Sequence, residues 1–210
     1  MPDPLGAVVL AAGSGRRIGT PKLRLEVEGR SYLGRILAQL VRTEIGPVVI
    51  VVAAAEEEWA RNLVREENRF SDPRPKETPA RQHGAEAALL VNPHPEQGMF
   101  SSIRLGVAAL MECAGLLIVP VDHPFVADST IIQLKRAFLQ NPAAVIKAAF
   151  HGRAGHPIII PQAVFQTVLA AGPDASLREL LRTAAVQRLS IEVDDEGILR
   201  NINERGDMEG

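Results

Sequence analysis

A cluster of positive charge follows the first apolar run of the chain. Residues 8–22 read VVLAAGSGRRIGTPK, and the glycines in this segment free the backbone to turn its N–H groups toward an anion. Four cations and no acid lie within residues 16–24, namely Arg16, Arg17, Lys22 and Arg24. Arginine offers a forked donor set that matches phosphate, and lysine offers a mobile point charge. The loop therefore indicates phosphate binding, although a solvated basic turn would have the same composition.

Two well-known glycine motifs for phosphate do not fit this loop. The dinucleotide fingerprint GxGxxG requires its third glycine at the position of Ile18. The Walker loop requires GxxxxGK[ST], but Lys22 comes three residues after Gly19 and no hydroxyl residue follows it. A plain NAD-binding module is further disfavoured because residues 53–55, after the second apolar run, contain no acid.

Two later segments place polar side chains at the ends of apolar runs. Residues 91–107, VNPHPEQGMFSSIRLGV, put Ser101 and Ser102 at the start of a helical pattern, where hydroxyl and N–H groups form a natural anion site. Residues 119–126, VPVDHPFV, end a strand-like run with Asp122. A carboxylate in that position suits a magnesium ion that carries phosphates. An ordinary serine cap and an ordinary aspartate turn are the alternatives.

The elements that must position these residues alternate between strands and helices. Apolar runs predict strands at residues 7–12, 48–52, 89–92, 116–121, 145–149 and 157–160. Helical spacing and caps predict helices at residues 31–43, 56–68, 101–112, 128–140, 162–171 and 176–185, with Ser101 or Ser102 and Asp128 or Ser129 as two of the N-caps. Residues 187–202 are expected to form a strand, a turn at 195–197 and another strand, and the proline-rich residues 71–84 an exposed loop.

This alternation predicts an α/β fold with a mostly parallel, doubly wound sheet and helices on both faces. Ligands of such sheets bind beyond the carboxyl ends of the strands, so functional residues are expected after positions 12, 92 and 121. No boundary divides the chain convincingly, and residues 1–210 are expected to form a single domain.

Composition excludes several classes of protein. The chain is 46% apolar and 23% charged, which predicts a packed core and not disorder. A net charge of -2 and 4% aromatic residues argue against nucleic acid and anionic membranes as partners. Cys113 is the only cysteine, which excludes an internal disulfide and a thiolate-rich zinc site, and it is expected to be buried. Without a signal-peptide start or a membrane-length apolar run, the expected location is the cytoplasm.

The first loop also resembles a family signature. LAAGSGRRIGTPK, residues 10–22, is similar to LAAGxSxRMGxxK of the nucleotidyltransferase superfamily that includes molybdenum cofactor cytidylyl- and guanylyltransferases. Residues 91–107 resemble the family's VNPxxxxGMxxSLRxG, residues 122–124 its DxP, residues 155–157 its GHP, and residues 197–208 its terminal (D/N)xNTPxD(L/M). The resemblance covers almost the whole chain. It implies a Rossmann-like fold of the nucleotide-diphospho-sugar transferase type.

The resemblance also implies roles for residues. The nucleotide would be bound by Leu10, Ala11, Ala12, Gly13, Ser14, Gly15, Arg16, Lys22, Asn92, Gly98, Ser101 and Ser102. The catalytic residues would be Arg16, Lys22 and Asp122, and the acceptor would be bound by Met99, His123, Gly155 and His156. Asp122 and Asn203 would hold Mg²⁺, with Glu204 as the alternative second ligand. A structural hydrogen bond remains the alternative for His156, and a turn for Asn203.

The implied reaction is the magnesium-dependent transfer of a nucleotide. A phosphate oxygen of the acceptor would attack the α-phosphorus of an NTP, and pyrophosphate would leave. The GMxxS form of residues 98–102 and LAAG in the first loop favour the cytidylyl branch, with CTP and molybdopterin as substrates. A guanylyltransferase of the same cofactor and an enzyme for a sugar or polyol phosphate are alternatives. So is a non-catalytic nucleotide-binding protein of molybdoenzyme maturation, for which a molybdoenzyme or its chaperone would be a partner.

Overall fold

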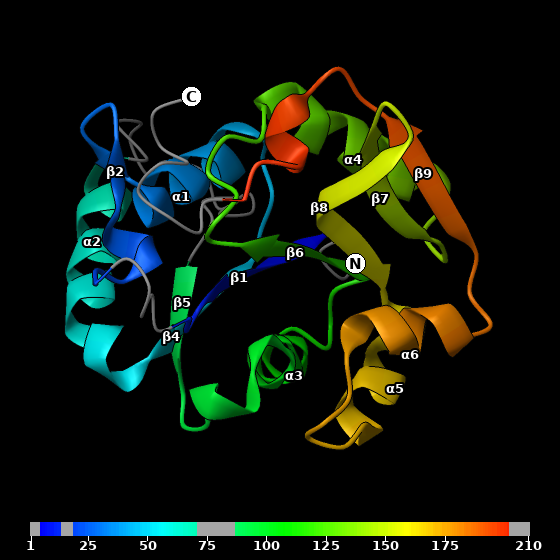
Figure 1. Ribbon diagram of the computed structural model, residues 1–210, viewed down its shortest axis with the longest axis horizontal. Coiled ribbons are helices and arrows are strands. Elements are labelled where there is room, and N and C mark those ends of the chain that lie inside the picture. The colour runs from blue at the N-terminus through cyan, green and yellow to red at the C-terminus, as the bar shows by residue number, and fades with distance from the viewer. Residues whose placement is uncertain (1–4, 14–18, 71–86, 202–210) are drawn as a thin grey trace, which may run out of the picture.

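A central sheet organises the protein (Figure 1). The computed structural model describes residues 5–13, 19–70 and 87–201. Within these ranges, seven strands form one sheet in the order β5-β4-β1-β6-β8-β7-β9. Their bounds are β1 (Gly6–Ala11), β4 (Val48–Ala53), β5 (Ala87–Asn92), β6 (Gly115–Pro120), β7 (Val145–Phe150), β8 (Arg153–Pro161) and β9 (Arg188–Glu192). A separate short ribbon pairs β2 (Glu26–Val27) with β3 (Arg30–Ser31).

The sheet is mostly parallel, as predicted. β1 pairs in parallel with β4 and β6, β4 with β5, and β7 with β9, whereas β8 runs antiparallel to both of its neighbours. β7 and β8 are joined by a tight turn in which His151 and Gly152 have φ angles of 49° and 73°. The β-branched runs of β1 and β4 are buried on both faces, as expected of strands covered by helices on either side.

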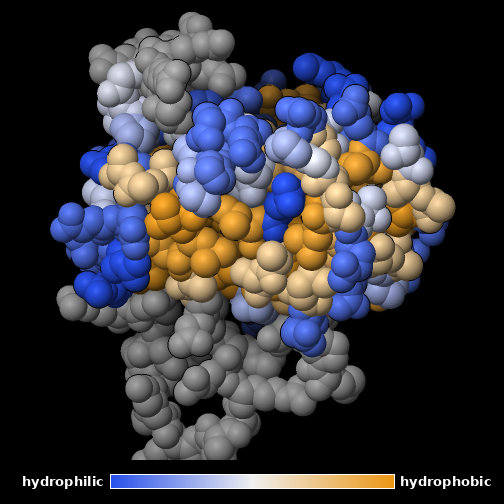
Figure 2. Space-filling view, turned by 90° about the horizontal axis from the view of Figure 1, so that it is seen from below, coloured by the Kyte–Doolittle hydropathy of each residue, from blue (hydrophilic) through white to orange (hydrophobic). Residues whose placement is uncertain are grey.

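Two layers of helices cover the two faces of the sheet (Figure 1). On one face, α1 (Tyr32–Arg42), α2 (Glu57–Phe70) and α4 (Asp128–Gln140) share a core with the sheet. On the other, α3 (Met99–Ala109), α5 (Phe165–Ala170) and α6 (Leu177–Thr183) do so. Seen from below, over the second layer, apolar side chains reach the surface between polar borders (Figure 2). The doubly wound architecture is therefore confirmed. No described helix is long and apolar enough to cross a bilayer.

The order of the strands places a ligand crevice between β1 and β6. From β1 the chain builds β4 and β5 on one side, then returns to β6 on the other side of β1. The connections after these two neighbouring parallel strands diverge, and this is where α/β sheets bind ligands. The glycine-rich loop follows β1, and Asp122 follows β6.

Three local predictions were wrong. Within the described residues, no strand follows β9, because the chain crosses the end of the sheet as a 3₁₀ turn, η5 (Glu196–Ile198). α3 begins at Met99 after Gly98, whose φ is 83°, so that Ser101 and Ser102 lie inside its first turn. α4 is preceded by Ala127, which has no capping side chain of its own.

Two further predictions concern Cys113 and residues 71–84. Cys113 is buried as expected, at 2% exposure. The predicted loop at residues 71–84 lies outside the described residues.

Candidate active site

Asp122 is the centre of the candidate site. Its carboxylate follows β6 and accepts hydrogen bonds from two side chains: Lys22 Nζ, at 2.9 Å from Oδ2, and His123 Nδ1, at 3.0 Å from Oδ1. The side chains of Lys22 and Asp122 are 19% and 20% exposed, so that the pair is shielded from water on most sides. A cation that follows β1 is thus joined to an acid that follows β6, across the crevice that the topology predicts.

The carboxyl group of Asp122 is ionised at neutral pH. Burial raises the pKa of its carboxyl, but the hydrogen bonds from His123 and Lys22 and the charge of the ammonium outweigh burial and hold the pKa at about 2. The ionised carboxylate therefore offers negatively charged oxygen atoms, and these are the ligands that Mg²⁺ and Mn²⁺ prefer.

Two cations of the basic loop, Lys22 and Arg24, have different partners. Lys22 begins a 3₁₀ turn, η1 (Lys22–Arg24), that is anchored by the fully buried Leu23. Because Lys22 and Arg24 flank this anchor, their side chains reach different partners. Arg24 pairs with Glu56 at 2.5 Å and lies over the ring of Trp59, so that it joins the loop to the start of α2. Ser14, Gly15, Arg16 and Arg17 lie outside the described residues.

The remaining part of the predicted nucleotide loop is the end of β1. Leu10, Ala11 and Ala12 are buried, and the carbonyl of Leu10 accepts a hydrogen bond from the N–H of Val121 at 3.1 Å. This bond ties the loop after β1 to the loop that carries Asp122. Gly13 is exposed, and among the described residues a Cβ atom there would meet nothing within 4 Å.

Asn92 holds the start of α3 in place. Its Nδ2 donates to the hydroxyls of Ser101 and Ser102 at 2.8 and 2.9 Å, and its Oδ1 accepts from the N–H of His94 at 2.8 Å. Ser102 is 3% exposed, and Ser101 donates to the carbonyl of Gly98 at 2.8 Å. The predicted nucleotide residues of this segment therefore form one cluster, in which Asn92 is buried and positions both serines.

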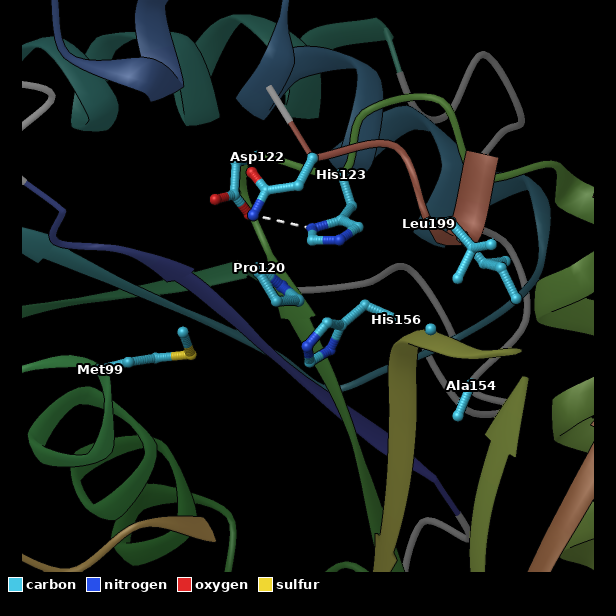
Figure 3. A pocket seen from close by; sticks show the side chains of 10 residues that line it. Met99, Pro120, Asp122, His123, Ala154, His156 and Leu199 are labelled. Atoms are coloured by element: carbon cyan, nitrogen blue, oxygen red, sulfur yellow. Dashed lines mark hydrogen bonds and ion pairs between the residues drawn. The ribbon is translucent and has the colours of Figure 1, made fainter. Parts of the chain in front are cut away.

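A pocket of about 250 Å³ opens beside Asp122 (Figure 3). We call it the Asp122 pocket, and it is lined by Met99, Pro120, Asp122, His123, Ala154, Gly155, His156, Ile198, Leu199 and Asn201. The four residues that the family resemblance assigned to the acceptor, from α3, the β6 loop and β8, all lie in this lining. Apart from Asp122, the two imidazoles and Asn201, the walls are apolar or glycine.

The two histidines of the pocket touch. The rings of His123 and His156 are 5.0 Å apart at their centroids and meet edge to face at 62°. Nδ1 of His156 is buried and has no hydrogen-bond partner among the described residues. Burial, together with the neighbouring His123, lowers the pKa of His156 to about 4, so that its ring is neutral at pH 7. The structural hydrogen bond considered for this residue is not found at Nδ1.

The wall formed by Ile198, Leu199 and Asn201 was not predicted from the sequence. Two close approaches of the backbone build it: a Cβ on Gly155 would overlap the carbonyl of Ile198, and one on Gly197 would overlap that of Phe125. The glycines at these positions were a usable signal, but only the fold reveals what lies against them. Asn203 and Glu204 lie outside the described residues, whereas Asn201 lines the pocket.

Asp195 fixes this wall to the rest of the protein. Its Oδ2 accepts from the N–H of Ala127 at 2.8 Å and from Thr130 Oγ1 at 2.6 Å, and its Oδ1 accepts from the N–H of Gly197 at 2.9 Å. The carboxylate thereby joins the residue before α4 and the first turn of this helix to a distant part of the chain, and it holds the turn that precedes Ile198.

Comparisons with known proteins identify the family of the chain. The model of the MobA-like NTP transferase domain family matches residues 7–189, a range that extends from β1 into the first residues of β9. No curated protein matches the sequence.

Solved structures share the fold. Rv0371c from Mycobacterium tuberculosis H37Rv is 19% identical with a TM-score of 0.70, and the alignment covers 99% of this chain and 96% of that one. A further structure of Rv0371c is a complex with manganese (17% identity, TM-score 0.61, coverage 92% and 90%). Molybdopterin-guanine dinucleotide biosynthesis protein A from Archaeoglobus fulgidus is 17% identical (TM-score 0.65, coverage 98% and 95%). The 4-diphosphocytidyl-2C-methyl-D-erythritol synthase from Anaerococcus prevotii is 14% identical (TM-score 0.72, coverage 98% and 95%).

Proposed function

Because the chain belongs to the MobA-like NTP transferase domain family and is thus a nucleotidyltransferase, we propose that it transfers CMP from CTP to the phosphate of molybdopterin. The observation that carries this proposal is the position of Asp122. Its ionised carboxylate is held by Lys22 on one side and by His123, a wall of the pocket, on the other. The loop proposed to bind phosphate and the pocket proposed for the second substrate thus both reach the carboxylate of Asp122.

The nucleotide is proposed to bind along the loop after β1. The open backbone of Gly13 and the ammonium of Lys22 are available to a triphosphate there, together with Arg16 and the other loop residues assigned from the signature. The cluster of Asn92, Gly98, Ser101 and Ser102 would take part at the start of α3, where N–H groups favour an anion.

A divalent cation, Mg²⁺ or Mn²⁺, is proposed at Asp122. The donor fits, because the carboxylate is ionised and offers oxygen. Within the described residues, no group of three His, Cys, Asp or Glu side chains could hold a metal by itself. Phosphate oxygens of the substrates, and Asn203 or Glu204, would therefore complete the coordination. When bound, the cation would supply charge neutralisation for the reacting phosphates.

The protein's own groups would act mainly by positioning and charge. An oxygen of the acceptor phosphate forms a bond to the α-phosphorus while the bond to the bridging oxygen breaks and pyrophosphate leaves. That phosphate oxygen is already anionic, so no strong general base is required. Lys22 and Arg16 would stabilise the negative charge that builds up on the transferring group and on the departing pyrophosphate.

The walls of the Asp122 pocket favour a ring-bearing acceptor over a polyol phosphate. A polyol would bring several hydroxyl groups that need hydrogen-bond partners. Met99, Pro120, Ala154, Ile198 and Leu199 offer none from their side chains. A flat ring could instead pack on the thioether of Met99, which is 55% exposed, and on the imidazole walls. This supports molybdopterin over methylerythritol phosphate or a sugar phosphate.

One screen tests the proposal. Pyrophosphate release is measured with each of the four common NTPs and Mg²⁺, with molybdopterin, methylerythritol phosphate or glucose 1-phosphate as the acceptor. We expect release with CTP and molybdopterin together. Release with GTP would identify the guanylyl alternative, and release with a polyol or sugar phosphate would identify another acceptor. Binding of NTP without release in any arm would favour the non-catalytic accessory protein.

A further inference from the structure

A lysine lies on the sheet next to the Asp122 pocket. Lys147 is in the middle of β7, opposite Ile158 of β8 and opposite Ser190 of β9. Directly opposed residues of neighbouring strands point to the same face of a sheet. Lys147 therefore shares the face of Ile158, which packs in the core under α3, α5 and α6. Its side chain is half-buried, whereas Ser190 is exposed.

Strand β8 connects Lys147 with the pocket. Ile158, opposite Lys147, lies two residues from His156, which lines the Asp122 pocket together with Ala154 (Figure 3). The β7–β8 ladder shifts register between Lys147 and Ala149, and Ala149 lies opposite Ala154. The charge of Lys147 is also close enough to contribute to the lowered pKa of His156. Strand register and this charge effect both place Lys147 near His156, although Lys147 is not among the residues that line the pocket.

Lys147 makes no hydrogen bond or ion pair with the described residues of the protein. The other charged groups on its face are Arg188 and Glu192 of β9, and each has a different partner. Arg188 donates to the carbonyls of Leu181 and Arg182, and Glu192 accepts from the N–H of Gly152 at 3.2 Å. A half-buried ammonium that makes no ion pair with the described residues can attract an anionic ligand, because removing a charge from water is costly unless it is paired.

We propose that Lys147 is a binding residue of the Asp122 pocket, and that the acceptor carries a second anionic group in addition to its phosphate. The acceptor phosphate would face Asp122 and the loop after β1. The body of the acceptor would lie against Met99 and the two histidines, and its second anionic group would reach Lys147. That this ligand is the acceptor rests on the proposed function, but the preference for a ligand with two anionic groups does not.

Two small probes test the preference without any turnover. 4-Carboxyphenyl phosphate and 4-nitrophenyl phosphate have the same ring, phosphate and planar oxygen pair, and only the first is negatively charged at both ends. Binding of each is measured by calorimetry in Mg²⁺ to the full chain, with wild type and with the Lys147→Met, Lys147→Arg and Arg65→Met variants. Arg65 is an exposed cation on α2, and its removal changes the net charge by the same amount as removal of Lys147.

The wild type should bind the carboxylate probe about tenfold more tightly, as expected for one charge-assisted contact. Lys147→Met should abolish this preference and leave the affinity for the nitro probe unchanged, whereas Lys147→Arg and Arg65→Met should retain it. Equal binding of the two probes by the wild type, or a preference that survives in Lys147→Met, would overturn the inference. Failure of the proposed function has a different signature, since it would appear as a lack of pyrophosphate release by the wild type.

Discussion

The ammonium of Lys22 lies 2.9 Å from the carboxylate of Asp122, although the two residues are 100 positions apart in the sequence. One residue follows β1 and the other follows β6, and these strands are hydrogen-bonded neighbours. The pair therefore forms as a direct result of the strand order, and it connects the glycine-rich loop after β1 with the Asp122 pocket.

Asp122→Asn should lower the rate of pyrophosphate release at least about 10²-fold, because it removes the anion that would hold the cation and Lys22. The measurement is steady-state turnover in Mg²⁺ and in Mn²⁺. Asp128→Asn is the matched control, since Asp128 pairs with Arg42 away from the pocket. Near-full activity of Asp122→Asn would rule out the metal assignment.

Exchanging the two charges separates structure from function at this pair. The double variant Lys22→Asp, Asp122→Lys keeps an ion pair and should retain the thermal midpoint to within a few degrees, because a part-exposed pair contributes only about 1 kcal/mol. Its turnover should still fall at least about 10²-fold, since the cation and the anion would face the wrong substrates. Recovery of activity in the double variant would show that only the ion pair itself matters.

Gly155→Ala should destabilise the protein by about 1–3 kcal/mol and weaken acceptor binding, because the added methyl group would overlap the carbonyl of Ile198 and displace the pocket wall. The measurements are urea unfolding and the KM for the acceptor. Gly172→Ala is the control, since a Cβ there meets nothing within 4 Å. If both variants behave like the wild type, the wall is not held by this contact.

Removing the carboxylate of Asp195 should destabilise the pocket wall at residues 198–201. Asp195→Ala leaves the N–H of Ala127 and the hydroxyl of Thr130 without their acceptor and should cost about 1–3 kcal/mol. Urea unfolding measures the cost, and the exposed neighbour Asp194→Ala should be close to neutral. Equal stability of the two variants would contradict the bridging role.

His156 should make the stability depend on pH. Its pKa is lowered to about 4 in the folded protein from 6.5, so the unfolded chain binds more protons between these values. The free energy of unfolding should therefore fall as the pH drops from 6.5 to 4, with a contribution of at most about 2 kcal/mol at pH 5. Urea unfolding at pH 7 and pH 5 measures this loss.

His156→Asn should remove this part of the pH dependence, whereas His94→Asn, at an exposed histidine, should not. An unchanged difference between pH 7 and pH 5 in His156→Asn would show that other groups cause it.

Local patterns were sufficient to predict the sheet and the residues at its carboxyl edge. The apolar run of β4 and the helical spacing of α1 are properties of short segments, and parallel pairing then brought Lys22 and Asp122 together. The shape of the segment after β9 could not be predicted from the sequence, because it depends on the hydrogen bond between Asp195 and Thr130, which are 65 residues apart. The N-cap of α4 was mispredicted for the same reason, since the carboxylate that holds the start of this helix comes from another part of the chain.

The pocket was also only partly predictable from the sequence. The motifs named Met99, His123, Gly155 and His156, and the structure brings all four together. The opposite wall depends on how closely two backbones approach at Gly155, which no spacing of residues encodes. Lys147 was missed because a single lysine in a strand has no distinctive pattern, and its position relative to the pocket follows only from strand register.

The wall at residues 198–201 also bears on the order of events during synthesis. The ribosome makes every described strand of the sheet before it makes Ile198, Leu199 and Asn201. A nascent chain can thus assemble the sheet and join Lys22 to Asp122 while the pocket is still open on one side. The wall of the Asp122 pocket at residues 198–201 is therefore completed only after the sheet and the Lys22–Asp122 pair can form.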